Sequence, residues 1–314
     1  MFLIVSPATW LLRVQFLGAR PSSHDGRLQG SSSVYGAHFE CGGEGLVVAQ
    51  TLRDLDEPIL VLGYAGGLTG ETLRRQMRDD GLDAHLIEIS SPSPMGLRLH
   101  EPNRGPSKPK LFLEPAAAIT GDDMRGLLRA FDRELSRAHG VFLCGCSPAR
   151  GAEFLFAEMA RRARRAGVSS FLLSDGEALS EALDAGPSYV ICGQRRLQKY
   201  CEEEELERER FFERLFAGGT KAVFVTQGDA PVQVRTPEGE ASVEPPHAAD
   251  RMGFGAREAF AAGLAHSLGQ DWDLLPSVFF GIGAGTARIQ NQLGGRLRRG
   301  AIEGFYRQVR HAGT

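Results

Sequence analysis

Short apolar runs alternate with longer segments of helical composition along most of the chain. Turn-forming residues bound the apolar runs, which is typical of strands buried on both faces of a parallel sheet. The predicted strands are residues 2–6, 59–63, 141–144, 171–173, 189–192 and 222–226. The predicted helices are residues 45–55, 71–81, 122–138, 152–166 and 202–216. This alternation predicts a doubly wound α/β core.

Two segments depart from the alternation. Residues 8–39 are rich in glycine, serine and polar residues, and residues 92–113 contain five prolines and two β-like stretches, 95–100 and 110–113. We expect these strands to lie outside the main sheet and to pair into a small flap or lid. The predicted organisation is a single domain, 1–314, with its core at 1–7, 40–91 and 114–314 and its lid at 8–39 and 92–113.

Composition and charge exclude several classes of protein. The 314 residues are 42% hydrophobic and 24% charged, as in an ordinary globular protein. Lys and Arg total 36 against 39 Asp and Glu, a formal net charge of −3, so we expect no nucleic-acid partner. No apolar stretch reaches the roughly 18 residues of a membrane helix, so no membrane partner is expected either. The five cysteines lack the regular spacing of a secreted disulfide framework, which favours a cytoplasmic location.

Four glycine-containing landmarks follow one another along the chain. They are CGGEGLVVA at 41–49, GYAGGLTG at 63–70, CGCSP at 144–148 followed by SDGEAL at 174–179, and GAREAFAAG at 255–263. In this order they resemble the motifs of the PfkB (ribokinase-like) carbohydrate kinases, in particular the 1-phosphofructokinase and tagatose-6-phosphate kinase branch. The resemblance spans essentially the whole chain. It implies a ribokinase-like three-layer α/β/α fold with a mainly parallel sheet and a small β-stranded lid, through which two copies form a homodimer.

The resemblance also implies a chemistry, the transfer of the γ-phosphoryl group of ATP to a sugar or sugar-phosphate hydroxyl. That reaction needs a general base, and an anion hole at the N-terminus of a helix. Glu258 stands where the family has the aspartate base, and Arg257 replaces the second glycine of the motif. A second register over 253–256 keeps both glycines but places alanine at the base position. The predicted anion-hole and nucleotide-binding positions are Gly253, Gly255, Ala256, Arg257 and Gly228.

The substrate side departs from the family pattern as well. Glu44 replaces the lysine that meets the substrate phosphate, so an attraction becomes a repulsion. Trp10 replaces the aspartate that grips sugar hydroxyls, and Ser93-Pro94-Met95-Gly96 lacks the arginine of the lid motif. Arg196 stands in place of the acidic residue linked to magnesium handling. The predicted substrate-pocket positions are Trp10, Gly42, Gly43, Glu44 and Pro94.

Other constellations have plainer interpretations. The glycine-rich segment 281–285 is too close to the C-terminus to open a dinucleotide-binding unit, so we interpret it as part of a helix. Cys144 and Cys146 lack the second ligand pair of a zinc site and are interpreted as buried thiols, so no metal ligands are predicted. The remaining candidates, interpreted as surface histidines, are His24, His38 and His247.

These departures favour a pseudokinase with a regulatory or structural role, whose partner is another protein or a second copy of this chain. We expect Trp10 and Phe254 to fill the former sugar and phosphate pockets and to close the groove. One alternative is an active phosphosugar kinase that uses ATP and Mg²⁺ with Glu258 as base. The other is a sensor that binds a nucleotide or a sugar phosphate without turnover.

Overall fold

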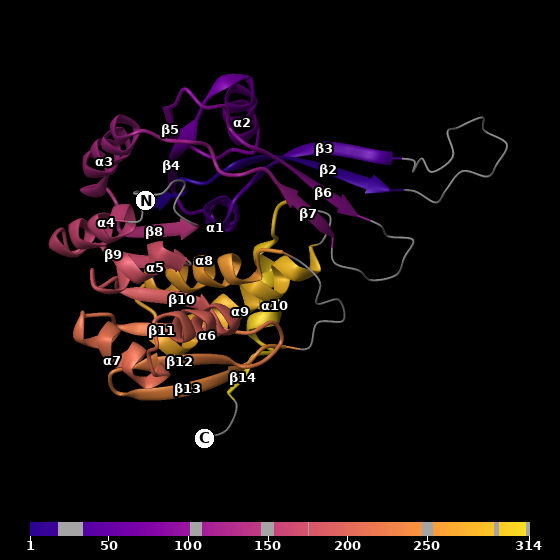
Figure 1. Cartoon of the computed structure of the whole chain (residues 1–314). Helices are drawn as coiled ribbons and strands as arrows, with labels where there is room; N and C mark the ends of the chain where they lie inside the picture. Colours follow the sequence, from indigo (N-terminus) through magenta and orange to yellow (C-terminus); the bar gives the residue numbers. More distant parts are fainter. Residues whose placement is uncertain are drawn as a thin grey trace.

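The computed structural model describes residues 1–17, 34–100, 109–145, 154–174, 176–246, 254–291 and 295–311. Within them, one large, mainly parallel sheet runs through the molecule (Figure 1). Its parallel strands are β1 (Phe2–Val5), β4 (Ile59–Ala65), β5 (Ala84–Glu88), β8 (Gly140–Gly145), β9 (Ser169–Ser174), β10 (Tyr189–Gly193) and β11 (Ala222–Thr226). Its antiparallel edge is formed by β12 (Val232–Thr236), β13 (Gly239–Glu244) and β14 (Arg310–His311). The order across the sheet is β14-β13-β12-β11-β10-β9-β8-β1-β4-β5.

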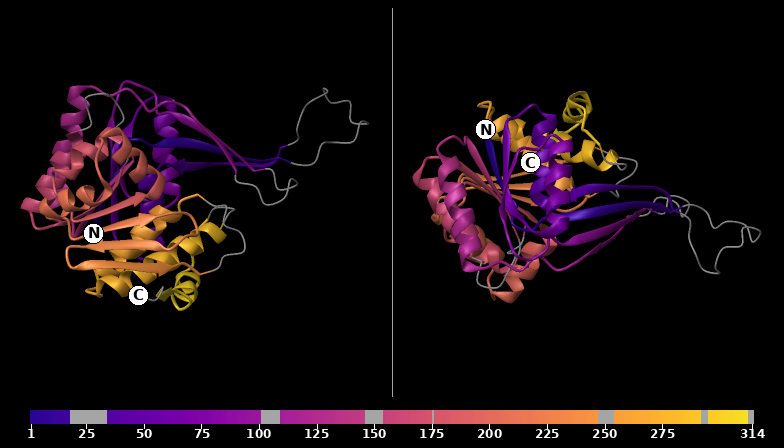
Figure 2. Two further views of the ribbon diagram at one scale, coloured as in Figure 1. Left: turned by 60° about the horizontal axis from the view of Figure 1, so that its bottom comes forward. Right: turned by 90° about the horizontal axis from the view of Figure 1, so that it is seen from above.

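Helices cover both faces of this sheet (Figure 2). One layer consists of α1 (Glu44–Asp54), α2 (Gly67–Asp79), α8 (Ala256–Leu268) and α9 (Leu274–Gln290), with α10 (Arg299–Tyr306) packed on α9. The other consists of α3 (Gly121–Leu135), α4 (Phe154–Arg165), α5 (Gly176–Leu183), α6 (Gln194–Glu203) and α7 (Arg208–Ala217). Alternate strand residues feed the two cores: Ile4 faces the first layer, and Leu3 and Val5 face the second. The predicted three-layer α/β/α fold is therefore confirmed.

A second, four-stranded sheet projects from the side of the core (Figures 1 and 2). It consists of β2 (Trp10–Leu17), β3 (Val34–Gly42), β6 (Met95–His100) and β7 (Lys110–Leu113), in the order β3-β2-β6-β7. The strands β2 and β6 are parallel, and the two outer pairs are antiparallel. This is the predicted lid, and its two later strands have the predicted bounds.

The single helix predicted over residues 202–216 is wrong. The structure has two helices there, because α6 ends at Glu203 and α7 begins at Arg208. Glu205 adopts a left-handed backbone conformation, with φ of 48°, and the Leu206 amide donates to the Cys201 carbonyl at 2.9 Å. This is the hydrogen bond that closes a helix C-terminus, a position where glycine is usual. A glutamate at this position is no sequence signal for a helix end, so the composition of the segment does not predict the break.

The glycine-rich segment 281–285 lies inside α9, as predicted, and allows a close crossing with α8. A Cβ at Gly281 would lie 2.7 Å from the Phe260 carbonyl oxygen, and one at Gly285 would lie 2.8 Å from that of Ala256. Any larger residue would push the two helices apart. The glycines therefore fix where the N-terminus of α8 meets the rest of the molecule.

Candidate functional site

The carboxyl ends of the parallel strands and the inner face of the lid enclose a cavity of about 980 Å³. Gly145, Gly193 and Thr226 line it from the ends of β8, β10 and β11, respectively. Ligands of open α/β sheets bind at this edge, where loops and helix N-termini converge. A smaller pocket of about 220 Å³ adjoins it and shares Gly228 and Arg257 with it. The two together form the candidate site.

The N-terminus of α8 forms one wall of the cavity. Gly255 caps the helix with φ of 88°, and a Cβ there would lie 2.8 Å from Val47 Cγ1. Only glycine adopts this conformation without strain. The unpaired amides and the dipole of the first turn favour an anion at this position. Ala256, Arg257 and Glu258 form the first turn, as the motif predicts.

One arginine joins two carboxylates of the site, Glu44 and Glu258. Arg257 Nη2 lies 2.7 Å from Glu44 Oε1 and 3.0 Å from Glu258 Oε1, and Arg257 Nε donates to the same Glu258 oxygen at 3.1 Å. Arg196 Nη1 also approaches Glu44 Oε1, at 3.4 Å. The side chains of Arg257 and Glu258 are only 13% and 10% exposed. The repulsion predicted at Glu44 is thus compensated within the chain, because the arginines at 196 and 257 pair with it.

Burial shifts the pKa values of two groups behind the site. The pKa of the Cys144 thiol is raised by burial, and further by the carboxylates of Glu44 and Glu258. It is a buried thiol, as predicted, whereas Cys146 lies outside the described residues. The pKa of Arg288 on α9 is lowered by burial, and its Nη2 donates to Gln50 Oε1 at 3.1 Å. Arg288 lies behind Gly255, and no motif of the sequence indicated it.

The lid contributes a second charged cluster at the cavity. Arg98 Nη1 donates to Glu40 Oε2 at 2.7 Å, and its guanidinium lies 5.8 Å from the centre of the Phe254 ring. Glu40 also pairs with His38, an exposed lid residue, at 2.8 Å. The His100 ring stacks on the ring of Phe16 in the neighbouring strand β2. The pKa of His100 is lowered by burial and, to a smaller extent, by the charge of Arg98. No motif of the sequence indicated Arg98, although strand alternation places it on the inner face of the lid.

The expected closure of the groove by Trp10 and Phe254 is wrong. Both residues line the cavity, but they leave it open. Trp10 Nε1 donates to the Glu114 carbonyl at 2.9 Å, which holds the indole against the base of the lid. Phe254 is 43% exposed at the mouth. Each ring forms part of a wall, and neither occupies the space between the walls.

The predicted site residues divide into three groups. Eight of them line the cavity: Trp10, Gly43, Glu44, Gly228, Gly255, Ala256, Arg257 and Glu258. Two lie behind it, because Gly42 is covered by Leu12 and the Pro94 carbonyl accepts from the Leu11 amide at the base of the lid. Gly253, like His24 and His247, lies outside the described residues.

The site fits an anion better than it fits magnesium. Mg²⁺ takes oxygen ligands in near-octahedral geometry. Here the carboxylates of Glu44 and Glu258 share one guanidinium, and Arg196 stands beside them. Among the described residues, no group of three or more histidine, cysteine, aspartate or glutamate side chains is arranged to hold a metal ion. The donor set therefore does not fit a magnesium centre.

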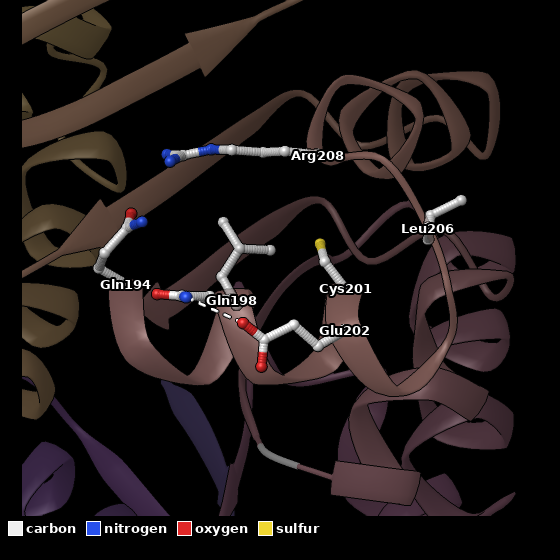
Figure 3. A pocket seen from close by; sticks show the side chains of 7 residues that line it. Gln194, Gln198, Cys201, Glu202, Leu206 and Arg208 are labelled. Carbon is white, nitrogen blue, oxygen red and sulfur yellow. Dashed lines mark hydrogen bonds between the residues drawn. The ribbon is translucent and has the colours of Figure 1, made fainter.

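A further pocket of about 300 Å³ lies along α6, between Cys201 and Arg208 (Figure 3). Gln198 bridges to Glu202 at 2.9 Å, and Arg208 crosses the pocket to bond with Gln233. Burial raises the pKa of Cys201, so its thiol is not activated. The residues in this pocket provide no nucleophile or paired acid and base.

Comparison with known proteins agrees with the fold. The pattern described as pfkB family carbohydrate kinase matches residues 22–296, so the chain belongs to this family. It is phosphofructokinase-like: it is 26% identical over 273 residues to ATP-dependent 6-phosphofructokinase isozyme 2 of Escherichia coli (strain K12), covering 85% of this chain and 86% of that protein.

Solved structures are similar over nearly the full length. Phosphofructokinase-2 from E. coli in complex with potassium has a TM-score of 0.84 at 24% identity, covering 98% of each chain. A possible 1-phosphofructokinase from Thermotoga maritima has a TM-score of 0.83 at 20% identity, covering 100% of each. At these identities the likeness is one of fold. In the part of the chain that the structure describes, none of the helices combines the length and apolarity needed to span a bilayer.

Proposed function

We propose that this PfkB-family protein is a pseudokinase: it keeps the fold and an open ligand cleft, but it transfers no phosphoryl group. The observation that carries the proposal is the ion-pair network of Glu44, Arg257 and Glu258. In it, the carboxylate at the base position and the cation at the anion hole are bound to each other.

The first group that this network affects is the residue at the base position. A general base must reach the substrate hydroxyl with a free oxygen lone pair. Glu258 Oε1 accepts from both Nε and Nη2 of Arg257, so one of the two carboxylate oxygens is directed to the arginine, and the side chain is almost fully buried. Releasing Glu258 would remove two hydrogen bonds of Arg257 and leave its largely buried charge paired with Glu44, which is costly. The geometry thus supports a structural role for Glu258.

The anion hole is altered in the same way. Phosphoryl transfer requires positive groups aimed at the charge that develops on the moving phosphate. The guanidinium of Arg257 lies in this region and is directed to Glu44, 2.7 Å away. The open cavity of about 980 Å³ nevertheless has the volume of a small-molecule site. Ligand binding without turnover, coupled to a regulatory or structural partner, is the function that we assign.

The lid supports association with a second copy of the chain. Its edge strand β7 is exposed, and Phe112 on it is 56% exposed on the face opposite to the cavity residues Leu111 and Leu113. An exposed apolar edge strand is normally covered in a stable protein. We assign a homodimer through the lid, in the cytoplasm. Light scattering should show a dimer that Phe112→Glu converts to monomer; a wild-type monomer at micromolar concentration contradicts the assignment.

A transfer assay tests the central proposal. The protein is incubated with ATP and Mg²⁺ and with fructose 6-phosphate, fructose 1-phosphate or tagatose 6-phosphate, and ADP formation is followed. We expect no ADP above that of the protein-free control. ADP formation that Glu258→Gln abolishes would establish the kinase alternative. Thermal unfolding in the same mixtures measures binding separately, since a ligand at 100 times its Kd adds about 2.7 kcal/mol.

A further inference from the structure

The wall of the cavity that the lid provides is apolar. Trp10 and Leu12 of β2 and Leu111 and Leu113 of β7 all line the cavity. The strand register explains this, because Gly96 of β6 pairs with both Leu12 and Leu113 and so puts the two leucines on one face. Side chains at alternate positions of a strand share a face, so the inner face of the lid is set by these residues.

Glycine lets these apolar side chains meet. A Cβ at Gly96 would lie 2.5 Å from Leu12 Cδ2 and 2.7 Å from Leu113 Cδ2. A Cβ at Gly42, on the other side of β2, would lie 2.5 Å from Leu12 Cδ1. Leu12 therefore spreads over both neighbouring strands and reaches Leu113. The result is a continuous apolar surface, with Trp10 at its inner end.

This surface offers little to a sugar. Among the described lid residues that line the cavity, Arg98 is the one with a charged or hydrogen-bonding side chain besides Trp10, and it is held by Glu40. The indole N–H of Trp10 is already donated to the Glu114 carbonyl. Hydroxyl groups placed against this wall would lose their water without gaining a partner, which opposes binding. A flat apolar ring would instead gain from burial against it.

The opposite wall of the cavity carries charged side chains of both signs. Apart from the lid, the described lining residues include three arginines, at 195, 196 and 257, against the carboxylates of residues 44, 229 and 258. Arg195 is exposed at the mouth and makes no ion pair with another described residue. The N-terminus of α8 adds its partial positive charge beside Arg257. One end of the cavity is thus apolar, and the other offers an anion the guanidinium of Arg195 and the start of α8.

We propose that the cleft binds a small molecule with a flat, apolar ring system and one anionic group, in preference to a sugar phosphate. The ring lies against Trp10, Leu12, Leu111 and Leu113, and the anion lies toward Arg195 and the start of α8. The inference rests on the proposed function for its site, and it names the class of ligand.

Calorimetric titration of the full chain tests the preference. The probes are 1-naphthyl phosphate, fructose 6-phosphate and inorganic phosphate, with 1-naphthoate to separate a phosphate from a carboxylate. We expect 1-naphthyl phosphate to bind at least about tenfold more tightly than fructose 6-phosphate and inorganic phosphate. Of these three compounds, it is the one that buries a flat apolar ring. Equal affinities, tighter binding of fructose 6-phosphate, or no binding of the naphthyl compounds would each overturn the proposal.

Matched variants locate the binding. Leu111→Gln should weaken 1-naphthyl phosphate at least about fivefold and leave inorganic phosphate unchanged, whereas Arg195→Gln should weaken both. Leu68→Gln, at an exposed leucine of α2 outside the cavity, is the control and should change neither. A loss that is the same in Leu68→Gln and Leu111→Gln would place the binding elsewhere. Phosphoryl transfer to fructose 6-phosphate would refute the proposal that the protein is a pseudokinase. Transfer is measured by ADP formation, separately from the binding of the naphthyl compounds, so the two proposals can fail independently.

Discussion

Removing the guanidinium of Arg257 should destabilise the protein through its two carboxylate partners. Glu44 Oε1 and Glu258 Oε1 both contact Arg257 Nη2, at 2.7 and 3.0 Å, so they lie no more than about 6 Å apart. At an effective dielectric of about 20, two like charges at that distance repel by about 3 kcal/mol. Breaking a buried ion pair costs a similar amount. We therefore expect Arg257→Ala to lower the free energy of unfolding by about 2–4 kcal/mol at pH 7.

Chemical denaturation measures this loss, with Arg195→Ala as the control. Arg195 is an exposed arginine of the same cavity that has no ion pair with a described residue, and its loss should change stability by less than about 0.5 kcal/mol. The double variant Arg257→Ala/Glu44→Gln should recover part of the loss, because it removes one of the repelling charges. A cost for Arg257→Ala no larger than that of the control, with no recovery in the double variant, would refute the reasoning.

Three further expectations follow from single positions. Gly255→Ala should lower the free energy of unfolding by about 1–3 kcal/mol, because its φ is 88° and the added Cβ meets Val47; a thermal midpoint equal to wild type contradicts it. Because the pKa of His100 is lowered in the folded state by burial and Arg98, the unfolded chain binds the proton more readily, so stability falls as pH drops through the ordinary histidine range near 6.5. His100→Gln should flatten that part of the stability curve relative to wild type, and an unchanged slope would contradict it. The Cys144 thiol, with its raised pKa, should resist alkylation at pH 8 until the protein unfolds, so rapid labelling of this residue in the native state, seen by peptide mapping, would be inconsistent with the structure.

The sequence predicts the core elements and the lid well, because both depend on local patterns. The strand bounds at 95–100 and 110–113 follow from β-like composition between prolines and match β6 and β7. The break between α6 and α7 does not follow, because it depends on a left-handed glutamate at position 205 rather than on a glycine or proline. Local preference is a guide to elements but not to every boundary.

The site is harder to predict, because its partners are far apart in the chain. When each motif is considered alone, the family pattern is broken at three separate positions, Glu44, Arg196 and Arg257. In the structure they meet, and the reversed charge at Glu44 is balanced by the two arginines. Pairing of this kind depends on tertiary contacts, so no spacing in the sequence could have indicated it.

The shape of the cleft was also beyond sequence reasoning. Trp10 is large enough to fill a sugar pocket, and its replacement of an aspartate predicts that it does so. Its orientation is set by a hydrogen bond to the Glu114 carbonyl, on a segment about a hundred residues away. The indole is thereby held against the lid, and the cavity stays open.

Single-turnover phosphoryl transfer tests the central claim most directly. The protein is mixed in excess over γ-labelled ATP with Mg²⁺ and a saturating ketose phosphate, and the label on the sugar is followed for hours, so that even slow chemistry is recorded. We expect labelling at the rate of the protein-free mixture, with no difference between wild type and Glu258→Gln. Transfer at about 1 s⁻¹ or faster, the ordinary range of enzymes, that is lost in Glu258→Gln would contradict it.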